Sequence, residues 1–233
     1  MNYWNKTRTP IYNLVFIIPV IIIYEIGVII ITKMEISNLR NGADVLLRML
    51  IDSFGPSSLY TLGFLLLIGA IISVIIQRRQ GGEVHIQGQY LVLMLFESVM
   101  WASIVFWLMN NRLFLSSAQS IVVVQQIILS LGAGIYEEFV FRVILISGLA
   151  VVFGFIFQWT IIIRSIAGII SAATLFSMFH FIGQFGDVFS WSLFFTRFIA
   201  GIMLGALFIF RGYGITAYTH AIYNLIVLTF TVT

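Results

Sequence analysis

The chain is a succession of long apolar runs separated by short polar loops. A helix of about 20 apolar residues crosses the roughly 30 Å hydrocarbon core of a bilayer. Helical runs of this kind are expected at residues 11–32, 59–76, 90–109, 121–131, 135–157, 165–182, 189–210 and 215–230. The pattern therefore predicts an all-α, polytopic membrane protein of about eight transmembrane helices.

Two stretches depart from this pattern. Between residues 33 and 58, charged side chains alternate with Leu, Val and Met, which predicts a short helix lying on the membrane surface. The apolar tract 120–163 would be about 66 Å long as a single helix, roughly twice the thickness of the bilayer core. It must bend, tilt or split, and Gly132 and Gly134 are the expected break. Loop charge favours one crossing over two for this tract.

Composition supports a membrane protein. Of the 233 residues, 61% are hydrophobic and only 9% are charged, whereas soluble domains carry roughly 25% charged residues. The net charge of +3 is spread over the loops, so no nucleic-acid partner is indicated. The chain has no cysteine, which excludes thiolate metal sites and cysteine catalysis. We expect one integral membrane domain over residues 1–233.

The segment GAGIYEEFVFR, residues 132–142, carries charge inside an apolar tract. Glu137, Glu138 and Arg142 are the only charged residues between Arg112 and Arg164. A charge at the centre of a membrane helix costs about 2.5–3.5 kcal/mol on insertion scales, so the group requires an explanation. Glu138 and Arg142 are four residues apart and can pair on one helix face, which leaves Glu137 free to act as a base. The alternative is an ion-pair network that only ties helices together.

Polar side chains also interrupt two later apolar segments. His180 ends one of them, and His220 and Asn224 share a helix face in the last. Together with Glu137 these groups are expected to line one shared, water-accessible cavity, because each is costly in the membrane without a partner. Such a cavity contains what water activation requires: a base, imidazoles that hold water or metal, and an oxyanion stabiliser.

Other polar residues are given simpler interpretations. His85 lies in a loop and is expected to be solvated. Glu25 and Glu97 lie in apolar segments without a local partner. Arg197 is expected to form a bridge with a carboxylate.

Four short motifs, in order, resemble those of the CPBP family of intramembrane proteases. EEFVFR is similar to its EExxxR motif, and Phe176–His180 to its FxxxH motif. Phe198–Gly201 is similar to the family's (F/W)xxG motif, and His220–Asn224 to HxxxN. The family includes type II CAAX prenyl endopeptidases and bacterial proteins linked to bacteriocin processing and self-immunity. The resemblance covers about residues 134–225, within a motif-bearing core of about 119–230.

The resemblance implies an eight-helix fold with a conical cavity and hydrolysis of a peptide bond. A water held between Glu137 and His180 would attack, and His220 and Asn224 would stabilise the oxyanion. Glu138 and Arg142 would position these groups. The family is described both as metal-dependent and as metal-free. Zn²⁺ or another divalent metal bound by Glu137, His180 and His220 therefore stays open beside a site without metal.

The function expected from these observations is an intramembrane endopeptidase that cleaves a membrane-associated peptide or protein of CAAX-like or bacteriocin-like type. A non-catalytic immunity or scaffold protein on the same fold is an alternative, because fold does not imply chemistry. A small proton-coupled transporter is a further one, since intramembrane Glu and His residues also relay protons. Expected partners are the substrate and the lipid bilayer of a prokaryotic cell membrane.

Overall fold

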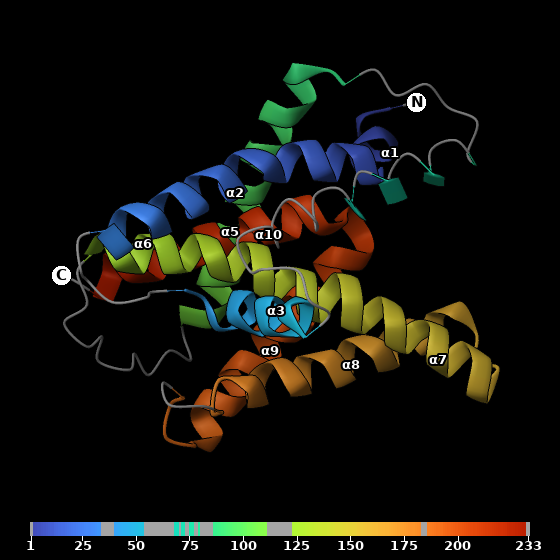
Figure 1. Ribbon diagram of the computed structural model, residues 1–233. Helices are drawn as coiled ribbons and strands as arrows, with labels where there is room; N and C mark the ends of the chain where they lie inside the picture. The colour runs from blue at the N-terminus through green and yellow to red at the C-terminus, as the bar shows by residue number, and fades with distance from the viewer. Residues whose placement is uncertain are drawn as a thin grey trace.

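The computed structural model describes residues 2–33, 40–53, 68–69, 71–72, 75–76, 79, 86–110, 123–182 and 186–231. The described residues form helices and no β-strand (Figure 1). The all-α prediction is therefore confirmed for this part of the chain. Most of the predicted span 59–76 lies outside the described residues, as do His85 and loop residues 183–185.

Eleven helical segments are present in the described residues. In chain order they are α1 (Tyr3–Thr7), α2 (Pro10–Lys33), α3 (Gly42–Asp52), α5 (Gly88–Asn110), α6 (Val123–Gly132), the π-helical segments η2 (Ala133–Glu137) and η3 (Phe139–Ile146), α7 (Ser147–Phe157), α8 (Ile161–Phe179), α9 (Trp191–Arg211) and α10 (Tyr213–Thr231). The segments from α6 to α7 run on without interruption as one helix of 35 residues, Val123–Phe157.

Five helices of the described residues are long and apolar enough to cross a membrane. They are Pro10–Ile31, Gly88–Met109, Val123–Phe157, Ile161–Phe179 and Trp191–Arg211. The protein is therefore a multi-pass membrane protein. From Val123 on, the predicted segments 121–131 and 135–157 belong to one helix, and α10 is helical but is not among the five. The expectation of about eight crossings thus exceeds what the described residues contain.

The long helix Val123–Phe157 lies between two groups of helices (Figure 1). Its first half contacts α2 and α10, and α10 packs in turn against α5. Its second half contacts α8, which packs against α9. The short helix α3 lies against η2, at the centre of the long helix. The middle of the long helix is therefore the place where segments from both halves of the chain meet.

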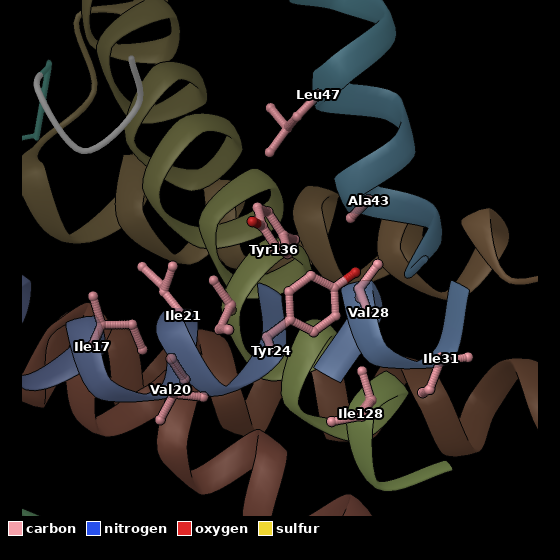
Figure 2. Packing of buried hydrophobic residues seen from close by; sticks show 12 residues of the cluster. Ile17, Val20, Ile21, Tyr24, Val28, Ile31, Ala43, Leu47, Ile128 and Tyr136 are labelled. Atoms are coloured by element: carbon pink, nitrogen blue, oxygen red, sulfur yellow. The ribbon is translucent and has the colours of Figure 1, made fainter. Parts of the chain in front are cut away.

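Helix α3 is the short helix expected within residues 33–58. Unlike a helix on a membrane surface, it directs most of its charged side chains into the protein. Its Ala43 and Leu47 are buried in a core cluster with residues of α2 and with Tyr136 of η2 (Figure 2). Its exposed large apolar side chains are Leu46, Met49 and Leu50, and Asp52 is exposed at its last position. The apolar face of α3 therefore points outward, while its charged face points into the bundle.

The charged face of α3 forms an ion-pair network with α2. Arg48 donates to Glu25 at 2.8 Å and to Asp44 at 2.6 Å, and Arg40 donates to Asp44 at 2.8 Å. Tyr136 donates a further hydrogen bond to Glu25 at 3.0 Å. Two acidic and two basic side chains leave the network neutral, and Glu25 has distant partners where the sequence showed no local one.

Two more charged side chains form ion pairs in the described residues. Glu97 of α5 pairs in a bidentate manner with Arg211 at the end of α9, with N–O distances of 2.5 and 2.7 Å. Arg197 of α9 pairs with Asp187, which confirms the expected bridge to a carboxylate. Glu97 and Arg211 are 114 residues apart in the sequence, which is why helical spacing alone did not indicate the partner of Glu97.

The glycines that were expected to break the long helix serve close packing instead. A Cβ atom on Gly134 would lie 2.4 Å from the carbonyl oxygen of Ala217 in α10, and one on Gly132 would lie 2.4 Å from the ring of Tyr24. Both positions are helical, and π geometry begins at Ala133. The prediction of a break was therefore wrong, because the glycines allow neighbouring backbone and rings to approach a continuous helix.

We predict that Gly134→Ala destabilises the protein by about 1–3 kcal/mol, the usual cost of overpacking. The new methyl group would meet α10 backbone, which cannot rotate away. Gly148→Ala on the same long helix is the matched control, because its Cβ would meet nothing within 4 Å. The control should be neutral or stabilising by up to about 1 kcal/mol through helix propensity. Thermal unfolding of both variants in the same detergent tests this, and equal midpoints would contradict the packing argument.

Candidate active site

Glu137 and Glu138 lie at the junction of the two π-helical segments near the middle of the long helix. Glu137 is 6% exposed and Glu138 is fully buried. π-Helical turns are uncommon and occur often at functional sites. Two adjacent carboxylates at this depth require separate partners, and the structure supplies them from different helices.

Glu138 is held between Arg142 and His220. Its Oε2 lies 2.9 Å from Nε of Arg142, and its Oε1 accepts a hydrogen bond of 2.7 Å from Nδ1 of His220 in α10. The predicted pairing of Glu138 with Arg142 is present. The two side chains are close enough for an ion pair, but their orientation does not meet the geometry of a hydrogen bond. The fully buried carboxylate is thereby compensated from its own helix and from α10.

The Arg142 guanidinium is also fully enclosed, and an aromatic ring covers it. Its central carbon lies 4.6 Å from the ring centroid of Phe176, within the range of a cation–π contact. The same ring meets His180 edge-on at 4.9 Å and His220 at 6.1 Å between centroids. Phe176 therefore packs against three of the predicted site residues and fixes their mutual spacing.

His180 lies where α8 ends. The helix was expected to continue to residue 182, but it ends at Phe179, and His180 is the residue that follows. Its Nδ1 lies 2.9 Å from the carbonyl oxygen of Phe176. Because a carbonyl oxygen can only accept, Nδ1 carries the proton. Nε2 faces the other way, 4.0 Å from Oε2 of Glu137.

The protonation state of His180 follows from its surroundings. Burial lowers the pKa of His180 below its ordinary value, although the neighbouring Glu137 acts in the opposite direction. Its ring is then neutral near pH 7, with an unprotonated Nε2. The imidazole side chain is 26% exposed, whereas the Glu137 side chain is 8% exposed. The site is therefore most accessible from the His180 side.

Asn224 lies one helical turn after His220 in α10 and is partly buried. Within the described residues its side chain makes no hydrogen bond. The structure thus brings Glu137, Glu138, Arg142, His180 and His220 into one cluster, and it places Asn224 on the helix that carries His220.

One residue of this cluster was missed by sequence reasoning. Asn41 precedes α3, and its side-chain Nδ2 donates a hydrogen bond of 2.8 Å to Oε1 of Glu137. Asn41 is the N-cap of α3, a position at which Asn is common. Nothing in the spacing indicated that this cap would contact a carboxylate 96 residues later in the chain.

The arrangement does not favour a metal site. In the part of the chain that the structure describes, no three His, Asp or Glu side chains are grouped so as to hold a metal ion. The set Glu137, His180 and His220 is therefore not such a group.

Comparison with known proteins gives one match. Residues 118–226 match the family model described as type II CAAX prenyl endopeptidase Rce1-like. The matched region contains the long helix, α8, α9 and most of α10, and thus every predicted site residue. No curated protein and no solved structure matches the chain.

We predict that Glu138→Gln destabilises the protein by about 3–5 kcal/mol, because it leaves the guanidinium of Arg142 buried without a counter-charge. The double variant Glu138→Gln/Arg142→Met should regain most of this loss, since Met removes the uncompensated buried charge and the Gln oxygen can still accept from Nδ1 of His220. Denaturation midpoints in detergent test both variants. A single variant as stable as the parent would show that the pair does not compensate a buried charge.

Proposed function

We propose that the protein is an intramembrane endopeptidase, because residues 118–226 match the family model described as type II CAAX prenyl endopeptidase Rce1-like. It hydrolyses a peptide bond of a membrane-associated peptide or protein. The attacking water is held between Glu137 and His180. The substrate class is CAAX-like or bacteriocin-like, with access to the site through the bilayer.

The main support for this proposal is that a hydrogen-bond acceptor of Glu137 faces one of His180 at the centre of the bundle. Oε2 of Glu137 and Nε2 of His180 are 4.0 Å apart. This is too far for a direct hydrogen bond, and it suits one water that lies about 2.8 Å from each atom. That water would donate one proton toward the carboxylate and the other toward the imidazole, which directs its lone pairs at a substrate carbonyl carbon.

The reaction then needs a single base. As the water oxygen bonds to the carbonyl carbon, Glu137 takes one of its protons and the carbonyl oxygen becomes an oxyanion. When the carbon–nitrogen bond breaks, the same proton passes from Glu137 to the leaving amine. The products are a new carboxyl terminus and a new amine, and Glu137 returns to its ionised form. The nearly complete burial of this carboxylate strengthens its electrostatic interactions with the reacting groups.

His220 and Asn224 are the proposed oxyanion stabilisers. With Nδ1 of His220 bound to Glu138, its Nε2 edge is left to meet substrate, and the proposed role requires Nε2 to carry a proton that it donates to the oxyanion. The Asn224 amide has no partner among the described residues, so its donors remain available. Glu138 and Arg142 position His220 and compensate charge in the proposed mechanism. Donors fixed in advance near a developing oxyanion are often the largest contribution to such catalysis.

We predict that Glu137→Gln and His180→Ala each lower the cleavage rate by about 10²–10⁴-fold, the usual contribution of a positioned acid–base group. The assay is mass spectrometry of prenylated CAAX peptides and of unmodified membrane peptides in proteoliposomes. Suitable controls are Asp52→Asn, an exposed carboxylate at the end of α3, and Met178→Ala, whose side chain is 48% exposed on α8. Both controls should cleave at the parental rate.

Retained cleavage by either active-site variant would rule out the proposed mechanism. Absence of cleavage by the parent protein on every membrane substrate, combined with immunity that survives Glu137→Gln, would favour the non-catalytic alternative.

We further predict that cleavage does not depend on a bound divalent metal. The parent protein, purified and treated with a chelator, should keep its rate within about twofold, since the proposed base is Glu137 itself. Elemental analysis of the same sample should show less than one metal ion per chain. Loss of activity with chelator, restored by Zn²⁺ alone, would contradict this prediction and revive the metal hypothesis.

A further inference from the structure

Asn41 contacts the proposed base from outside the region that matches the protease family. The family match begins at residue 118, whereas Asn41 precedes α3 in the first part of the chain. Its side chain is buried and donates to Oε1 of Glu137 at 2.8 Å. The family match therefore assigns no role to Asn41.

The orientation of the Asn41 amide is determined by its second contact. Its Oδ1 accepts a hydrogen bond of 2.9 Å from the backbone N–H of Ala43, which makes Asn41 the N-cap of α3. A backbone N–H can only donate, so the amide oxygen must face the helix. The NH₂ group must then face the carboxylate of Glu137. One side chain thus caps a helix and supplies a charge-assisted donor to the proposed base.

The backbone of Asn41 is held as firmly as its side chain. Its N–H donates to the hydroxyl of Tyr24 at 3.1 Å, and this hydroxyl donates to Asp44 at 2.9 Å. Figure 2 shows Tyr24 of α2 next to the beginning of α3. On the other side, a Cβ atom on Gly132 would lie 3.0 Å from Cβ of Asn41, so the long helix approaches closely. The neutral network of Arg40, Asp44, Arg48 and Glu25 ties α3 to α2.

We propose that Asn41 is a positioning residue of the active site. By binding Oε1 of Glu137, it keeps the other oxygen, Oε2, directed at Nε2 of His180. One oxygen of the carboxylate, Oε1, thus holds the side chain in place, and the other, Oε2, is left to accept the proton. The inference rests on the proposed function, because it concerns the geometry of the proposed base.

The test separates the two contacts of Asn41. Asn41→Ser and Asn41→Asp both keep a side-chain oxygen that caps α3, and Asp is as good an N-cap as Asn. Both remove the NH₂ donor to Glu137. The peptide cleavage assay in proteoliposomes gives kcat and KM for each variant, and thermal unfolding in the same detergent gives its stability.

We expect kcat of Asn41→Ser to fall about 10- to 100-fold, the range for loss of a hydrogen bond to a charged group. KM should stay within about twofold, because substrate need not touch Asn41, and the unfolding midpoint should change little because the cap remains. Asn41→Asp should lose more activity than Asn41→Ser, since it places a second carboxylate against Glu137. A role as helix cap alone predicts the opposite order, with Asn41→Asp at least as active as Asn41→Ser.

Two outcomes would overturn the role of Asn41 without affecting the proposed function. The first is a parental kcat in Asn41→Ser while Glu137→Gln is inactive. The second is a loss of activity in the Asn41 variants that only follows their loss of folded protein. If instead Glu137→Gln cleaves as fast as the parent protein, the proposed function fails, and the role of Asn41 fails with it.

Discussion

The structure depends on the cost of placing charge in an apolar membrane bundle. An isolated intramembrane charge costs several kcal/mol, so each one is stable only beside a partner. Some of these partners come from distant parts of the chain, such as His220 for Glu138, and such contacts also fix how helices pack. In the described residues, three groups of this kind join different helices: Glu138 with Arg142 and His220, Glu25 with Arg40, Asp44 and Arg48, and Glu97 with Arg211.

Glu137 differs from the other buried carboxylates in how it is satisfied. No arginine lies within ion-pair distance of it in the described part of the chain, and its one direct hydrogen bond comes from the neutral amide of Asn41. Its second oxygen faces an imidazole across 4.0 Å. A carboxylate held by an arginine on both oxygens would be a poor proton acceptor, because protonation would break the pair. A carboxylate held through one oxygen keeps its position and retains an acceptor for chemistry.

Sequence reasoning succeeded where an interaction is local and failed where it is not. Helical spacing indicated the Glu138–Arg142 pair, because residues four apart share a face. The ordered motifs indicated the same family whose model matches residues 118–226. The contact between Asn41 and Glu137 is set by how α3 docks, and no periodicity encodes it. The predicted helix break at Gly132 and Gly134 was wrong for the same reason. Whether a glycine breaks a helix or allows a neighbouring segment to approach closely depends on what packs against it.

The unbroken helix explains how two adjacent glutamates reach opposite surroundings. A break before Glu137 would have left both carboxylates on a loose segment at membrane depth, where unpaired backbone groups are costly. The continuous helix keeps its backbone bonded, and the close contact of Gly134 with α10 holds the next residues at a fixed depth. Glu138 then meets His220 on α10, while Glu137 meets Asn41 and His180 on the other elements. Neighbours in sequence thereby acquire different electrostatic roles: Glu138 is paired with the Arg142 cation and bonded to His220, whereas Glu137 is left able to take a proton.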